Sequence, residues 1–154
     1  MIDVKSIVGG YNWYCVIRGR GVDIITSGGR DIDILADSSP LFVYHITRRI
    51  KNNVIVNALP HGRFHVDILD EHGNFVFRFD IIDNLKTYGV NENLKNDILN
   101  TAIIENSLKY PTIENEAILR YLEYRLHPEK TKHTMYFDNH TPDNWDEIKR
   151  RHGI

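Results

Sequence analysis

The sequence has little that would place it in a specialised class of protein. It contains a single cysteine, Cys15, which excludes an internal disulfide and a zinc site built from several thiolates. Its formal net charge is only −2, so no global basic field attracts nucleic acid or an anionic membrane. No apolar stretch approaches the roughly 18 residues that a membrane-spanning helix needs. The first residues also lack the charged and apolar regions of a signal peptide. We therefore expect a cytoplasmic protein with no membrane partner.

The size and composition are those of one globular domain. Hydrophobic residues make up 42% of the 154 residues and charged residues 26%. There is no repeat, low-complexity tract or long linker. We predict a single domain over residues 1–154, with a mixed-sheet core over residues 1–83 and a helical extension over residues 84–154.

The first half of the chain reads as strands with one helix. Ser39 and Pro40 predict a helix start, because a capping hydroxyl precedes a proline in the first turn. The strand at 75–82 alternates, and Phe75, Phe77 and Phe79 should form an aromatic floor on one face. Short β-favouring or alternating runs predict strands at 13–17, 31–35, 54–56, 63–69 and 75–82.

The second half reads as helices. Apolar residues of helical period predict a helix over 91–109, which Pro111 ends. Thr112 should cap a second helix that runs to Leu126, and Thr141-Pro142 should start a last short helix. The fold class that follows is α+β, with a mixed β-sheet and a helical C-terminal half.

Two aspartates stand out in the strand at 31–35. Side chains at positions i and i+2 of a strand point to the same face, so Asp31 and Asp33 project together while Ile32 and Ile34 pack on the other side. Neighbouring carboxylates repel each other, and a shared proton or a bound cation relieves that repulsion. Mg²⁺ suits such a site because it combines a few carboxylate oxygens with water and substrate phosphates. Without further context, such a pair more often indicates the solvated face of an edge strand.

A third acidic residue supports the metal-site interpretation. Asp67 lies between apolar neighbours in the strand at 63–69, and it can complete a three-carboxylate site if the two strands are adjacent. Asp80, in the strand that follows, is the alternative for this third position. We predict that Asp31, Asp33 and Asp67 are the catalytic and metal-binding residues, with Mg²⁺ or Mn²⁺ as the ion.

These residues resemble the nucleotidyltransferase superfamily that includes DNA polymerase beta. The shared order is an apolar strand ending in Gly, a spacer at residues 21–30, Asp-apolar-Asp-apolar, a helix, and a strand with a further Asp. A closer resemblance is to a little-described branch of small nucleotidyltransferase-like proteins, carried by Val16-Ile17-Arg18-Gly19 and Asp31-Ile32-Asp33-Ile34-Leu35. The resemblance covers residues 12–135 and implies a nucleotidyltransferase-like mixed-sheet core.

The resemblance also implies a nucleotide-binding segment around the glycines. The family has a small residue where this chain has Arg20, so Arg18 and Arg20 would contact phosphate as cations while glycines let the backbone approach. The residues expected to bind nucleotide in this segment are Arg18, Gly19, Arg20, Gly28 and Gly29.

A basic group near the end of the helical half is a second candidate for phosphate binding. Lys130, Lys132 and His133 could reach a triphosphate from the helices that cover the site. Their other interpretation is a solvated helix end.

The resemblance implies transfer of a nucleoside monophosphate. Asp31 and Asp33 would hold the metal against a nucleoside triphosphate, and Asp67 would help activate the hydroxyl of an unknown acceptor. Nucleic acid is a possible acceptor that the net charge does not indicate. Two alternatives remain open: a metal-dependent phosphohydrolase or nuclease that uses water, and a catalytically degenerate protein that binds a nucleotide or a partner, for which Arg20 is the argument.

Overall fold

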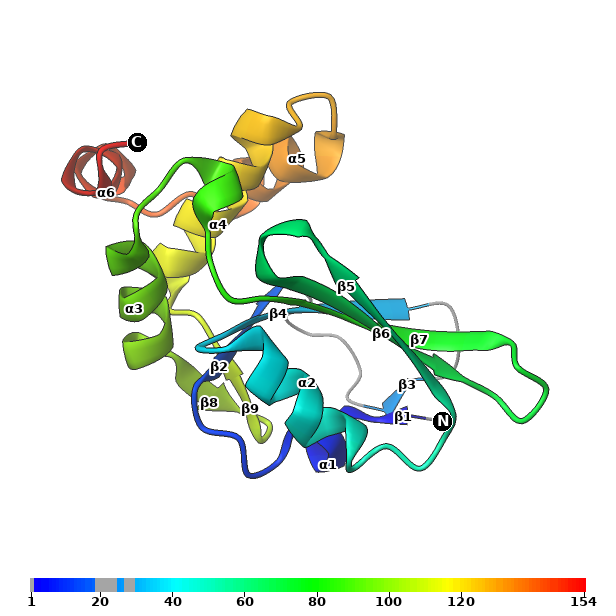
Figure 1. Cartoon of the computed structure of the whole chain (residues 1–154). Helices are drawn as coiled ribbons and strands as arrows, with labels where there is room; N and C mark the ends of the chain where they lie inside the picture. The colour runs from blue at the N-terminus through cyan, green and yellow to red at the C-terminus, as the bar shows by residue number, and fades with distance from the viewer. Residues whose placement is uncertain (1, 19–24, 27–29) are drawn as a thin grey trace.

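A five-stranded mixed sheet forms the centre of the computed structural model, which describes residues 2–18, 25–26 and 30–154 (Figure 1). Strands β4 and β7 are parallel, and every other neighbouring pair in this sheet is antiparallel. The predicted α+β class with a mixed sheet is therefore confirmed. In spatial order the strands are β2 (Tyr14–Arg18), β4 (Arg30–Ala36), β7 (Phe75–Ile82), β6 (Arg63–Leu69) and β5 (Val54–Leu59).

Helices and two short strand pairs surround this sheet. The helices are α1 (Val4–Val8), α2 (Ser39–Thr47), α3 (Glu92–Thr101), α4 (Ile113–Leu126), α5 (Thr131–His140) and α6 (Trp145–His152), with 3₁₀ turns η1 (Pro60–Gly62) and η2 (Lys86–Tyr88). The strand pairs are β1 (Ile2–Asp3) with β3 (Ile25–Thr26), and β8 (Ile103–Glu105) with β9 (Leu108–Tyr110).

The helix caps confirm two predicted helix starts. Thr112 caps α4, because its hydroxyl accepts a hydrogen bond from the Asn115 amide at 3.2 Å. Helix α2 begins where expected, although its capping hydroxyl belongs to Ser38 and Pro40 lies within the first turn.

The predicted helix over 91–109 is wrong beyond Thr101. Asn106 and Ser107 both have positive φ, 50° and 65°, which suits the tight turn of a β-hairpin and ends the helical period. The chain forms β8 and β9 there. Helix α5 was not predicted.

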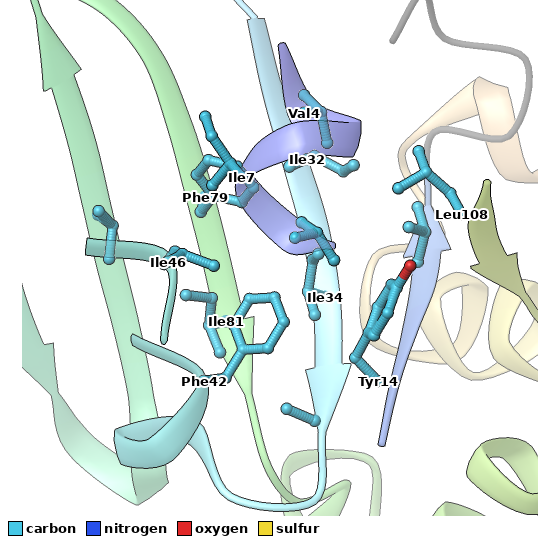
Figure 2. Packing of buried hydrophobic residues seen from close by; sticks show 14 of the residues in the cluster. Val4, Ile7, Tyr14, Ile32, Ile34, Phe42, Ile46, Phe79, Ile81 and Leu108 are labelled. Atoms are coloured by element: carbon cyan, nitrogen blue, oxygen red, sulfur yellow. The ribbon is translucent and has the colours of Figure 1, made fainter. Parts of the chain in front are cut away.

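One face of the sheet carries the larger core. Alternate residues of the strands point to it, and α1 and α2 cover them (Figure 2). Phe79, Ile34 and Phe42 are fully buried there. Phe75 is the exception to the predicted aromatic floor: its side chain is 46% exposed, and the Arg78 guanidinium lies 5.6 Å from its ring centre.

The second face of the sheet carries apolar side chains at one end of its strands and charged side chains at the other. At one end Cys15, Ile17, Leu35 and Ile82 pack against α3 and α4 in a separate apolar cluster. Asp33 precedes Leu35 by two residues in β4, and Asp80 precedes Ile82 by two residues in β7. Both aspartates therefore lie on this same face. No helix within the described ranges is long and apolar enough to cross a membrane.

Candidate functional site

Two rows of charged residues cross the polar end of the second face. In the first row Asp33 on β4 lies opposite Asp80 on β7, which lies opposite His65 on β6. In the second row Arg78 on β7 lies between Asp31 on β4 and Asp67 on β6. The rows are two residues apart along each strand, which corresponds to about 7 Å.

The first row forms part of an open pocket of about 560 Å³. Asp33, Asp80, Arg18 and Arg63 line it from the sheet. Glu123, His127 and Lys130, from α4 and the segment after it, also line it, as do Tyr88 and, from the turn between β5 and β6, His61. The volume falls within the range of about 300–1,000 Å³ that is typical of small-molecule sites.

A β-bulge in β2 directs Arg18 towards Asp33. Val16 lies opposite Ile34, but the register then shifts so that Arg18, rather than Ile17, lies opposite Asp33. The extra residue turns the Arg18 side chain to the polar face. Its Nε donates to Asp33 Oδ2 at 3.0 Å.

Glu123 connects the same arginine to the helical half. The Arg18 Nη1 and the Tyr88 hydroxyl both donate hydrogen bonds to Glu123 Oε1. Glu123 is only 8% exposed, so its charge is buried together with its partners. Burial by itself would raise the pKa of Glu123, but the Tyr88 hydrogen bond and the Arg18 charge outweigh it and lower that pKa.

Asp80 is held by a two-pronged ion pair. Arg63 Nε donates to Asp80 Oδ1 at 2.9 Å, and Arg63 Nη2 donates to Oδ2 at 2.7 Å. His65 Nε2 lies 3.4 Å from Oδ1. Although burial opposes ionisation, the hydrogen bonds and charge of Arg63 lower the pKa of Asp80.

Asp33 is in a less favourable electrostatic position. Burial raises its pKa, and the charges of Asp80 and Asp31 act in the same direction, while Arg18 opposes them. A carboxylate surrounded in this way is stabilised by any further cation that enters the site.

The predicted residues Asp31 and Asp67 project from the same face as Asp33, but in the second row. Asp31 is exposed. Asp67 accepts from Arg78 through both oxygens, at 2.6 and 3.0 Å. Neither residue lines the pocket. Of the two candidates for the third carboxylate, Asp80 is therefore the one adjacent to Asp33.

The predicted phosphate-binding residues are divided among several places. Arg18 and Lys130 line the pocket, and Lys132 is exposed on α5. His133 is fully buried, and neither ring nitrogen has a hydrogen-bond partner among the described residues. Burial and the charge of Arg120 lower its pKa, which favours a neutral ring. The predicted residues Gly19, Arg20, Gly28 and Gly29 lie outside the described residues.

The donor chemistry of this face suits a hard divalent cation. Among the described side chains, Asp33, Asp67, Asp80 and Glu123 pair with three arginines, and carboxylate oxygens are the ligands that Mg²⁺ prefers. Within the described part of the chain, however, no group of three His, Cys, Asp or Glu residues could hold an ion as arranged here. Arg63 instead engages both oxygens of Asp80, while Arg18 engages one oxygen of Asp33, so Asp80 must exchange its partner before it can serve as a ligand.

Three residues that line the pocket were not predicted from the sequence: Arg63, Tyr88 and Glu123. Glu123 could have been found from the sequence, because it follows Leu122 on the inner side of α4. A carboxylate at a buried position needs a charged or hydrogen-bonding partner. Arg63 could also have been found, since it shares a strand face with His65 and Asp67. Tyr88 had no comparable signal, because a 3₁₀ turn has no extended periodicity.

No protein-family model matches the sequence, and no curated protein matches it. The fold has a partial likeness to two solved structures from Helicobacter pylori. One is JHP933, with a TM-score of 0.44 and 12% identity over 76% of this chain. The other is described as a "putative nucleotidyltransferase", with a TM-score of 0.43 and 13% identity over 76% of this chain. The match spans 50% and 52% of the lengths of those two proteins.

Proposed function

We propose that this protein is a metal-dependent nucleotidyltransferase that transfers a nucleoside monophosphate from a nucleoside triphosphate to a hydroxyl acceptor. The observation that carries the proposal is the opposition of Asp33 and Asp80 on parallel neighbouring strands, facing one open pocket. The Asp-Ile-Asp sequence adds Asp31 on the same face. Asp80 takes the third position, and Asp67 stays with Arg78.

The residues of the pocket divide into two chemical groups. Asp31, Asp33 and Asp80 would hold Mg²⁺ or Mn²⁺, which neutralises phosphate charge and polarises the reacting phosphorus. Arg63 and Lys130 are cations on the pocket wall that suit the phosphates of the nucleotide. This separation matches a ligand that carries phosphate and metal together.

The proposed reaction forms one bond and breaks one. The acceptor oxygen bonds to the α-phosphorus, and the bond from that phosphorus to the pyrophosphate oxygen breaks. The hydroxyl proton passes to a carboxylate of the pocket, and the departing pyrophosphate is stabilised by the cationic side chains. The chain's own contribution is to position charge around the phosphates.

A nucleotide panel tests the proposal directly. The melting temperature is measured with each of the four ribonucleoside triphosphates, with and without Mg²⁺ or Mn²⁺. Because ligand binding to the folded state stabilises it by mass action, at least one nucleotide with metal should raise the melting temperature. Incubation with nucleotide labelled at the α-phosphate should then label an acceptor. Release of labelled nucleotide to water alone would instead support a phosphohydrolase.

A second candidate function is nucleotide binding without turnover. The arginine pairs on Asp33 and Asp80 favour it, because they leave no three-carboxylate group free within the described residues. Melting-temperature shifts by nucleotide without transfer or hydrolysis in any metal would select this candidate over the enzyme.

A further inference from the structure

Arg63 blocks the carboxylate that the proposed metal site needs. Its Nε and Nη2 engage both oxygens of Asp80, so no oxygen of Asp80 is free of the guanidinium. The two partners differ in access to solvent: the Arg63 side chain is 47% exposed, while that of Asp80 is 11% exposed. The arginine can therefore move more readily than the aspartate.

The backbone that carries Arg63 is firmly held. Arg63 follows the turn Pro60–Gly62 at the tip of the β5–β6 hairpin. The Ser39 hydroxyl donates to the Gly62 carbonyl at 2.6 Å, and the Asn84 side-chain amide donates to the His61 carbonyl at 2.7 Å. A fixed backbone with a long, half-exposed side chain suits an arginine that changes its partner within the pocket.

We infer, resting on the proposed function, that Arg63 is a phosphate-binding residue that leaves Asp80 for the nucleotide when metal and nucleotide enter the pocket together. A guanidinium binds phosphate oxygens through the same pair of parallel N–H donors with which it binds a carboxylate. Asp80 would then hold the metal in place of Arg63, and Arg63 would hold the phosphates in place of Asp80. No buried charge loses its partner in this exchange.

Coupled binding of metal and nucleotide follows from the exchange. Metal alone must displace Arg63 and leave it without an anion, and nucleotide alone must draw Arg63 away and leave Asp80 without a cation. Each ligand therefore strengthens the other's binding, and the coupling is reciprocal. We expect each ligand to raise the affinity for the other by about tenfold or more.

The sheet provides a matched control for this arginine. Arg78 pairs with Asp67 through the same two-pronged geometry, and its side chain is 36% exposed. It projects from the same sheet face, but it does not line the pocket. Arg78→Gln thus removes an equivalent ion pair outside the pocket and leaves the Arg63–Asp80 pair in place, although Asp31 lies opposite Arg78.

Calorimetric titration measures the affinity of the protein for Mn²⁺ and for a non-hydrolysable nucleoside triphosphate analogue. Each affinity is measured with that ligand alone and again with the other ligand at saturation. Arg63→Gln should bind Mn²⁺ alone more tightly than the wild type, because Asp80 is freed. The same variant should bind the analogue about tenfold more weakly when Mn²⁺ is saturating, since a phosphate contact is lost. Arg78→Gln, which removes a positive charge opposite Asp31, should keep the wild-type coupling between Mn²⁺ and the analogue. Arg63→Lys, which keeps a cation without the pair of parallel N–H donors, should give an intermediate coupling.

Two results would overturn the inference while leaving the proposed function intact. One is wild-type coupling in Arg63→Gln. The other is tighter Mn²⁺ binding by that variant with unchanged analogue affinity, because Arg63 would then only mask Asp80. Absence of analogue binding by the wild-type protein in any metal is a different outcome, and it would overturn the proposed function itself. Circular dichroism of each variant verifies that it is folded.

Discussion

Asp33 and Asp80 occupy directly opposed positions on the parallel strands β4 and β7, and both line the same pocket. The two residues are far apart in the sequence, and their carboxylates are each compensated by a different arginine. This opposition makes Asp80, rather than Asp67, the neighbour of the Asp-Ile-Asp pair.

Single substitutions should distinguish the proposed metal ligands Asp33 and Asp80 from Asp67. Asp80→Asn and Asp33→Asn should each reduce metal-dependent nucleotidyl transfer by about a hundredfold or more, because a ligand charge at the reacting phosphates is lost. Asp67→Asn removes only a partner of Arg78 and should keep most of the activity. Initial rates at saturating metal measure the effect. Equal losses in Asp67→Asn and Asp80→Asn would contradict this assignment.

The double substitution of the Asp-Ile-Asp pair gives a complementary result. Asp31→Asn combined with Asp33→Asn should abolish metal-dependent nucleotide binding or turnover while the protein stays folded. Removal of like charges from one strand face also relieves repulsion, so the melting temperature without ligand should not fall markedly. Full activity in this variant would show that the site lies elsewhere.

Glu123 should make stability depend on pH. Its pKa is lowered in the folded protein, so its stabilising contribution is present above its ordinary value of 4.5 and is lost as pH falls through the folded-state pKa. At neutral pH, Glu123→Gln should lower the free energy of unfolding by about 1–3 kcal/mol, because Arg18 and Tyr88 lose a charged acceptor. The difference from the wild type should shrink below pH 4.5. Urea unfolding at a series of pH values measures it.

A surface glutamate supplies the control for this pH dependence. Glu129 is 67% exposed, and its partner is His127. Glu129→Gln should leave the unfolding free energy nearly unchanged at every pH, as expected for an exposed pair. A constant difference between Glu123→Gln and the wild type down to strongly acidic pH would contradict the role assigned to the Glu123 charge.

Two phenylalanines of β7 should differ sharply in their contribution to stability. Phe79 is fully buried and packs edge-on against Phe77, with ring centres 5.3 Å apart. Phe79→Ala should therefore lower the free energy of unfolding by about 3–5 kcal/mol through lost burial and a cavity. Phe75→Ala, at a position 46% exposed, should cost much less. Chemical unfolding of the two variants measures the contrast, and equal losses would mean that Phe75 also belongs to the core.

Much of the local structure could be predicted from the sequence. The alternation at 31–35 and 75–82 and the cap at Thr112 agree with the observed strands and helix. The helix predicted over 91–109 failed in its second half, because the turn at Asn106 and Ser107 depends on positive φ values that apolar periodicity does not reveal. Of the residues named from the sequence, Arg18, Asp33, Asp80 and Lys130 line the pocket, whereas Arg63 and Glu123, which also line it, were not predicted.

The sequence by itself determined that Asp31 and Asp33 share a face, since alternation of side chains is a property of the extended backbone. Only the tertiary structure decided which acid stands beside them. The parallel pairing of β4 with β7, the bulge that redirects Arg18 and the approach of α4 all join residues that are distant in the chain. Local alternation fixes the face on which each side chain lies, but the packing of the whole sheet decides which strands become neighbours.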